Sequence, residues 1–171
     1  MSRAFVKEND LEHAGTDFPE RPQSPHPNYV TPTGLAQLQA QADRLEKERR
    51  ALSPRKEDPV VRQQLAIVER DLRYFVGRLE SAIPVDIAHQ PDDSILFGAT
   101  VTVEDENGDT HVFRIVGEDE ADIARSKVSW TSPLARALLG HRIGESVVWA
   151  RPAGNLELEI TAIRYSVDKD A

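Results

Sequence analysis

Two stretches of the chain carry apolar residues at intervals of three and four, and this spacing constrains the fold more than any other feature. In the first stretch the apolar positions are Leu35, Leu38, Ala42, Leu45 and Leu52, and Arg49 takes the apolar position expected between the last two. In the second they are Val61, Leu65, Val68, Leu72, Phe75, Leu79 and Ala82. On a helix, each set forms a narrow apolar stripe, or seam, that is too narrow to cover a globular core. Its heptad spacing instead favours packing against one partner helix. Because a short connection makes consecutive helices antiparallel neighbours, residues 31–83 are predicted to form an antiparallel two-helix coiled coil.

Both predicted helices begin with the same local signal, a residue able to cap followed by a proline. Thr31 precedes Pro32, and Asp58 precedes Pro59. A Thr or Asp side chain can accept a hydrogen bond from the first helical turn, and proline suits the first helical position because its missing N–H costs nothing there. At 1.5 Å per residue, arms of about 20–24 residues reach roughly 30–36 Å.

The first thirty residues show neither a helical nor a strand period. They are rich in proline, with Pro19, Pro22, Pro25 and Pro27 close together. This composition favours an extended, polyproline-like path. Residues 1–30 are therefore predicted to be an extended or disordered arm, either a solvated tail or a strap laid on the surface.

A period of two replaces the helical pattern after Pro84, and this change predicts strands. Residues 84–94 are expected to be a linker, and residues 95–166 a compact domain. Within that domain, Asn107-Gly108 is a typical hairpin turn between two alternating segments.

One short helix is expected among these strands. It begins at Ser132-Pro133 and is closed by Gly140. The predicted fold class is therefore α+β, with an N-terminal antiparallel two-helix coiled coil and a C-terminal antiparallel sheet that carries one short helix.

The composition excludes several classes of function. The chain has no cysteine, which rules out disulfides, thiolate catalysis and cysteine–zinc sites. Its five histidines show no ligand spacing and it has no glycine-rich phosphate loop, so we expect no metal site, no cofactor of its own and no self-contained active site. A net charge of −8 disfavours sequence-independent nucleic-acid binding by the chain as a whole. Without a signal peptide or a long apolar stretch, we expect a cytoplasmic chain that makes no membrane contact. We also expect it to be a monomer.

The turn between the two helices, RALSPRKEDPVVRQQ at residues 50–64, is the candidate functional site of the hairpin. Its adjacent acids, Glu57 and Asp58, can hold a divalent cation or orient a water, since hard cations prefer oxygen ligands. In the plainer alternative, Asp58 caps the second helix and Glu57 is a nearby acid favoured by the helix dipole. The sequence leaves both interpretations open.

Basic residues crowd the same half of the hairpin. The candidate RNA or phosphate contacts are Arg49, Arg50, Arg55, Lys56 and Arg62. The same residues suit an exposed helix face with ion pairs such as Glu46–Arg50. The pattern alone does not distinguish these two roles.

The C-terminal half resembles the bacterial Gre transcription elongation factors, GreA and GreB. The resemblance is carried by FGATVTVEDENGDTHVFRIVGEDEAD, VSWTSPLARALLG and IGESVVWARPAGNLELEITAIRY, which cover nearly all of residues 95–165. It implies an FKBP-like C-terminal domain that docks at the rim of the RNA polymerase secondary channel, and a coiled coil that enters the channel toward the catalytic Mg²⁺. The docking residues implied by the resemblance are Thr131, Ser132, Pro133 and Arg136.

The turn departs from the family pattern, which reads approximately Gly-Asp-x-x-Glu-Asn-Ala followed by an acid and a tyrosine. None of this motif carries over residue by residue onto the stretch RRALSPRKEDPVV, so the acids by which the family supports transcript cleavage cannot be assigned in this chain. The hairpin is also about two heptads shorter, one in each arm, which removes roughly 10 Å of reach. In this respect the chain is similar to Rnk-type proteins, which regulate nucleoside diphosphate kinase.

These observations leave two non-enzymatic functions open. In the first, the chain binds RNA polymerase, places its hairpin in the secondary channel, contacts nascent RNA and modulates elongation or arrest. Assistance to transcript cleavage, by positioning Mg²⁺ held by the polymerase, is a further possibility within this function. In the second, the chain is a Rnk-like regulator of nucleoside diphosphate kinase or another partner. Peptidyl-prolyl isomerisation is suggested by the FKBP-like fold alone, and fold does not imply function.

Overall fold

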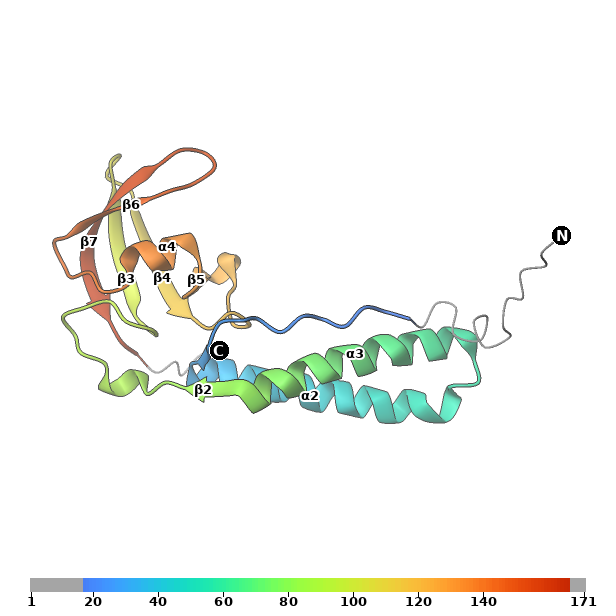
Figure 1. Ribbon diagram of the computed structural model, residues 1–171. Helices are drawn as coiled ribbons and strands as arrows, with labels where there is room; N and C mark the ends of the chain where they lie inside the picture. Colours follow the sequence, from blue (N-terminus) through green and yellow to red (C-terminus); the bar gives the residue numbers. More distant parts are fainter. Residues whose placement is uncertain (1–16, 167–171) are drawn as a thin grey trace. The chain divides into compact units, whose positions relative to one another are not determined.

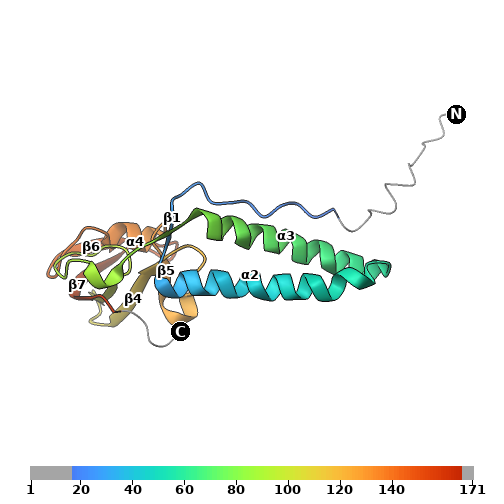
Figure 2. The ribbon, with the colours of Figure 1, turned by 90° about the horizontal axis from the view of Figure 1, so that it is seen from below.

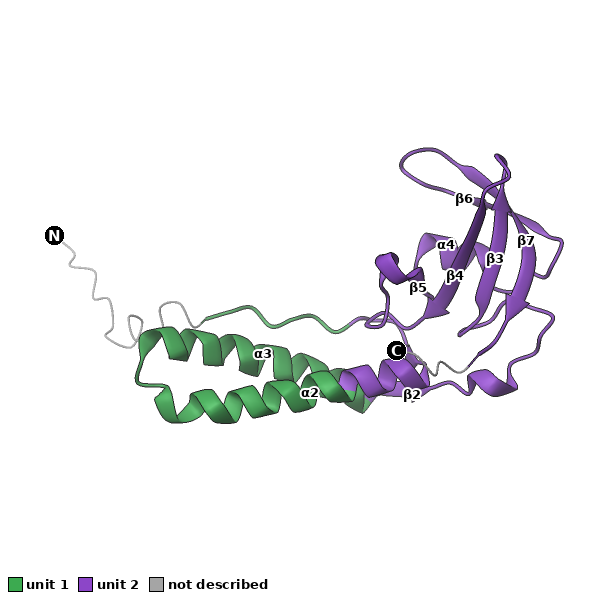
Figure 3. Ribbon diagram, turned by 180° about the vertical axis from the view of Figure 1, so that it is seen from behind, with its two compact units in different colours: residues 1–23, 39–80 green, residues 24–38, 81–171 purple. Residues whose placement is uncertain are grey.

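The computed structural model describes residues 17–166, and these divide into two compact units (Figure 3). The first unit contains residues 17–23 and 39–80, and the second contains residues 24–38 and 81–166. The predictions made for residues 1–16 lie outside the described part of the chain. No helix within residues 17–166 combines the length and apolar character that a membrane span requires.

A helical hairpin forms most of the first unit, although the first seven residues of its first helix belong to the second unit. Helix α2, Pro32–Leu52, continues into the 3₁₀ turn η1, Ser53–Arg55, and helix α3, Pro59–Ser81, returns beside it (Figures 1 and 2). The buried side chains of the seam in this unit are Ala42, Leu45, Val61, Leu65 and Val68. The antiparallel two-helix coiled coil predicted from the heptad spacing is confirmed. Its helices of 21 and 23 residues are about 31 and 35 Å long.

Both helix starts have the predicted capping geometry. The Thr31 hydroxyl oxygen accepts a hydrogen bond from the Gly34 N–H at 2.9 Å. The Asp58 carboxylate accepts one from the Val60 N–H, also at 2.9 Å. Each cap satisfies a backbone donor that the helix itself leaves unpaired.

A five-stranded sheet, in the order β5-β4-β3-β7-β6, forms the centre of the second unit. Its strands are β3 Thr100–Asp105, β4 Thr110–Val116, β5 Lys127–Ser129, β6 Ser146–Trp149 and β7 Leu156–Arg164. All neighbouring pairs are antiparallel except β4 and β5, which are parallel. This pair differs from the predicted antiparallel arrangement because the chain crosses through the 3₁₀ turn η3, Ile123–Arg125, and enters β5 in the direction of β4.

The short helix α4, Pro133–Leu138, completes this unit and supplies part of its core. Ser132 caps α4, and its hydroxyl accepts a hydrogen bond from the Ala135 N–H at 3.2 Å. Alternate residues of the strands and the inner face of α4 are fully buried together, among them Val101, Val103, Leu138, Leu158 and Ile160. The α+β fold class is therefore confirmed.

A second, two-stranded sheet has no signal in the sequence. Strand β1, Asn28–Val30, pairs in parallel with β2, Ala82–Pro84. The following 3₁₀ turn η2, Ile87–His89, buries Ile87 against Gly98. Gly98 has a φ of 89°, and a β-carbon there would lie 2.7 Å from Ile87 Cγ1, so the position requires glycine. The segment predicted as a linker is thus packed against the sheet domain.

Residues 17–27, which we call the N-terminal strap, are extended and contact each unit separately. In the first unit, residues 17–23 contact helix α3. The Arg73 Nε donates to the Glu20 carboxylate at 3.1 Å, and the Arg21 guanidinium lies 3.9 Å from the centre of the Tyr74 ring. The Gln23 side-chain amide donates to the Tyr74 carbonyl at 3.1 Å. These contacts place this half of the strap against α3.

Reversing the charge of Glu20 is expected to release the start of the strap from α3, because the new cation would repel Arg73. The chain has no cysteine, so cysteines introduced at Asp17 and Gln63 would be its only thiols for two spin labels. Pulsed EPR should show a narrow distance distribution in this background and a broad one after Glu20→Arg. Adding Arg73→Glu should restore the narrow distribution. Equally narrow distributions in all three proteins would show that the ion pair does not hold the strap.

Candidate functional site

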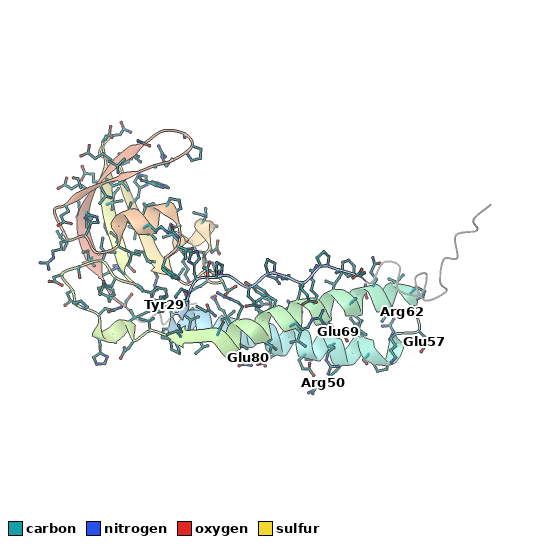
Figure 4. The ribbon with its side chains drawn as sticks, in the orientation of Figure 1. Tyr29, Arg50, Glu57, Arg62, Glu69 and Glu80 are labelled. Carbon is teal, nitrogen blue, oxygen red and sulfur yellow. The ribbon has the colours of Figure 1, made fainter. Side chains whose placement is uncertain are left out.

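Both candidate acids are exposed at the turn of the hairpin, but they differ in their hydrogen bonds. The Asp58 N–H donates to the Arg55 carbonyl at 3.1 Å, and the Asp58 carboxylate caps helix α3. Glu57 lies at the turn (Figure 4), is exposed, and makes no hydrogen bond or ion pair with the rest of residues 17–166. One exposed acid therefore has a structural task, whereas the other has no partner in the described part of the chain.

The two acids have no third ligand nearby. Among the described residues, no group of three or more His, Cys, Asp or Glu side chains lies close enough together to hold a metal ion. One oxygen of Asp58 is engaged with the Val60 N–H. Since hard cations take six or more oxygen ligands, a cation bound at Glu57 and Asp58 would need most of its ligands from another molecule or from water.

The basic residues of the hairpin divide into two groups. In the first group, Arg49 and Arg50 both bind the Glu46 carboxylate, at 2.8 and 2.9 Å. The hydrogen bonds from Arg49 and then Arg50 lower the pKa of Glu46 to about 2. The Glu46–Arg50 pair predicted from the sequence is thus present, and the charges of these two arginines are partly balanced within the helix.

This depressed pKa predicts how the ion pairs respond to acid. Because the pKa of Glu46 is about 2 in the folded chain against an ordinary 4.5, the pairs stabilise helix α2 fully above about pH 4.5, and their contribution is lost as the pH falls through about 2. An NMR titration of the Glu46 side-chain carboxyl carbon should have its midpoint near 2. Replacing both arginines, as Arg49→Gln with Arg50→Gln, should return the midpoint toward 4.5. A wild-type midpoint already near 4.5 would contradict the pairing.

The second group lies at the turn itself. Arg55 and Lys56 are exposed, and neither has an ion-pair partner within residues 17–166. Arg62, also near the turn (Figure 4), donates its Nε to the Lys56 carbonyl at 3.2 Å. Of the five candidate phosphate contacts, Arg55 and Lys56 therefore present the most available positive charge.

The second candidate site is the Ser-Pro turn, residues 129–133, which connects β5 to α4. The Ser129 hydroxyl lies 2.7 Å from the Thr131 hydroxyl and accepts the Thr131 N–H at 3.1 Å. The Ser132 N–H donates to the Ser129 carbonyl at 2.9 Å. These three bonds fix the turn before the helix begins.

Two side chains at the start of α4, next to this turn, are exposed. Pro133 and Arg136 both face solvent on α4, and the Arg136 guanidinium has no partner within the described residues. The structure therefore brings together the four residues implied by the resemblance, Thr131, Ser132, Pro133 and Arg136, on one turn and the helix that follows it.

A buried carboxylate that the sequence did not indicate lies at the start of helix α2. Glu120 is 7% exposed, and its carboxylate accepts a hydrogen bond from the Thr31 hydroxyl. The same hydroxyl oxygen accepts the Gly34 N–H. Because a buried carboxylate is tolerated only with such partners, Glu120 fastens the first turn of α2 to the sheet domain. Thr31 was predicted as a cap, but no local pattern pointed to its partner 89 residues away.

The sheet domain is similar in sequence to a known protein family. Residues 90–165 match the family model described as "Transcription elongation factor, GreA/GreB, C-term". Among solved structures, GreA factor homolog 1 of Thermus thermophilus aligns at 22% identity and a TM-score of 0.40, covering 81% of this chain and 99% of that one.

Curated relatives extend the match beyond the sheet domain. The transcription elongation factor GreA of Nitratidesulfovibrio vulgaris is 32% identical over 150 residues, which cover 80% of this chain and 92% of that protein. GreA of Trichlorobacter lovleyi is 39% identical over 115 residues, covering 67% of this chain and 73% of the relative. GreB of Neisseria meningitidis serogroup B is 39% identical over 105 residues, which cover 61% of this chain and 64% of that protein. This chain therefore belongs to the GreA/GreB family of transcription elongation factors.

Proposed function

We propose that this chain is a non-enzymatic elongation factor that acts on bacterial RNA polymerase in the cytoplasm. The observation that carries the proposal is the 32% identity to a GreA that spans 92% of that protein's length. A match confined to the sheet domain would also suit a Rnk-like regulator. A match over nearly a whole GreA favours a factor that uses both its hairpin and its sheet domain.

The sheet domain supplies the docking surface in this proposal. The Ser-Pro turn is held by its own hydrogen bonds, so Thr131 and Ser132 lose little conformational entropy when a partner binds. Pro133 and Arg136 face solvent beside it. An exposed arginine can form two parallel hydrogen bonds with a carboxylate, which favours an acidic partner surface at the rim of the secondary channel.

The hairpin then occupies the secondary channel, and its turn acts by contact. Arg55 and Lys56 are available to the phosphates of nascent RNA. Asp58 caps its own helix, which leaves Glu57 as the only acid of the pair without a structural task. In this role the factor modulates elongation and arrest by occupying the channel and excluding other ligands. Positioning of polymerase-held Mg²⁺ by Glu57 and Asp58 is the alternative role of the turn.

A retention experiment tests the proposal. The full chain, immobilised through an added tag, is incubated at low salt with a bacterial lysate and with purified core RNA polymerase. We expect core polymerase to be retained from both, and purified polymerase to lose part of its binding when salt is raised, since charged contacts are screened. A folded chain that retains no polymerase but retains nucleoside diphosphate kinase would replace this proposal with the Rnk-like function.

A further inference from the structure

The second half of the N-terminal strap lies against Trp130, a residue of the Ser-Pro turn. The His26 ring meets the Trp130 ring edge-on, with centroids 5.8 Å apart. Tyr29 meets the same ring edge-on at 5.2 Å and also contacts Phe97 at 5.9 Å. All of these residues belong to the second unit. Trp130 is thus packed against two aromatic rings supplied by the strap and β1.

The strap is fixed at this place by polar bonds as well. The Ser24 hydroxyl donates to a Glu118 carboxylate oxygen at 2.9 Å and accepts the His26 N–H at 3.2 Å. Gly117 allows β1, which directly follows the strap, to approach closely, because a β-carbon at this position would lie 2.4 Å from the Tyr29 carbonyl oxygen. These contacts are specific to residues 24–30 and place His26 opposite Trp130.

Within residues 17–166, the Trp130 ring is held by packing contacts and not by a hydrogen bond. Its backbone N–H donates to the Val116 carbonyl at 2.9 Å, but its indole N–H is buried without a hydrogen-bond partner among the described residues. A buried indole normally finds such a partner, which fixes the ring. Here packing alone holds the ring, against His26, Tyr29 and the buried core, so removing one neighbouring ring should loosen its orientation.

A change at Trp130 reaches the Ser-Pro turn directly. Trp130 stands between Ser129 and Thr131, whose side chains and backbone form the bonds of the turn. We propose that the N-terminal strap is a positioning element for partner docking: His26, with Tyr29, holds Trp130 and thereby presets the Ser-Pro turn that binds RNA polymerase. This inference rests on the proposed function, and it assigns His26 a positioning role and no direct contact with the polymerase.

The test measures polymerase affinity and the state of Trp130 separately. The chain has two tryptophans, so 5-fluorotryptophan labelling gives two ¹⁹F signals, and Trp149→Phe identifies the signal of Trp130. In the full chain, His26→Ala should shift or broaden the Trp130 signal and weaken binding to core polymerase about threefold, in line with the worth of one edge-on aromatic contact. His26→Phe, which keeps a ring, should restore both readouts.

The matched control lies in the other half of the same strap. Glu20→Ala removes a contact with α3 in the first unit and should change neither the Trp130 signal nor the affinity. Unchanged affinity after His26→Ala with an altered Trp130 signal would overturn the inference and leave the proposed function intact. An unaltered Trp130 signal, or an equal loss of affinity after Glu20→Ala, would also overturn it. Failure of the wild-type chain to bind polymerase would remove the proposed function and, with it, the docking role of the strap.

Discussion

Replacing Gly117 with alanine is expected to lower the free energy of unfolding of the second unit by about 2 kcal/mol, within the range for overpacking a filled site. The added β-carbon would lie 2.4 Å from the Tyr29 carbonyl oxygen, which is backbone and cannot move aside as a flexible side chain can. Strand β1 or the end of β4 must therefore shift. Tryptophan fluorescence during urea unfolding measures this change, since Trp130 and Trp149 both lie in the second unit.

Gly34→Ala is the matched control for this substitution. A β-carbon at Gly34 would have its nearest neighbours at 3.4 Å, which is an ordinary contact. Gly34 also lies inside helix α2, where alanine is favoured over glycine by roughly 0.5–1 kcal/mol. We expect Gly34→Ala to leave stability unchanged or to raise it. Equal unfolding curves for the two variants would show that the approach of Tyr29 to Gly117 is looser than the structure indicates.

Reversing the charge of Arg136 is expected to weaken binding to core RNA polymerase at least tenfold. Arg136 is exposed and has no partner in the described chain, so Arg136→Glu should not alter folding. If the docking surface of the polymerase is acidic, the new carboxylate meets like charge, and such juxtapositions cost several kcal/mol. Affinity measured at two salt concentrations should also show a weaker salt dependence for the variant.

Arg142→Glu is the control for a general charge effect. Arg142 is also exposed, and it pairs only weakly with Asp93, at 3.6 Å. The two variants have the same net charge, so long-range electrostatic changes are matched. An equal loss of affinity in both would place the effect in the net charge of the chain rather than at the Ser-Pro turn.

Much of the fold could be predicted because its signals are local in the sequence. The heptad spacing identified the two helices, and the pairs Thr31-Pro32 and Asp58-Pro59 identified where they begin. In each case the residues that carry the signal are only a few positions apart. The pattern can therefore be recognised within a short stretch of sequence.

The contacts that the sequence did not indicate join distant residues. The Thr31–Glu120 bond spans 89 positions, and the parallel pairing of β1 with β2 joins Tyr29 to Ile83. A three-residue strand is too short for a period of two to be recognised. The proline-rich strap gave a prediction of extended backbone, but its path depends on His26, Trp130 and other partners that no spacing rule connects.

The candidate site was predicted as a set of residues and not as an arrangement. The sequence placed Glu57 and Asp58 at the turn together, whereas the structure assigns Asp58 to the cap and leaves Glu57 exposed. It likewise grouped five basic residues, and only the structure shows that the charges of Arg49 and Arg50 are shared with Glu46. Side-chain pairing on an exposed helix depends on rotamers, which residue spacing constrains only loosely.

Transcript cleavage in a stalled, backtracked elongation complex tests the central claim most directly, namely that this factor acts by occupying the secondary channel and not by supplying acids to the polymerase metal. Cleavage is measured with polymerase alone, with the wild-type chain, and with Glu57→Ala combined with Asp58→Ala. We predict that both proteins bind the complex and that neither raises cleavage above that of polymerase alone. Strong cleavage with the wild-type chain, lost in the double variant, would contradict the account and assign Mg²⁺ positioning to the two acids.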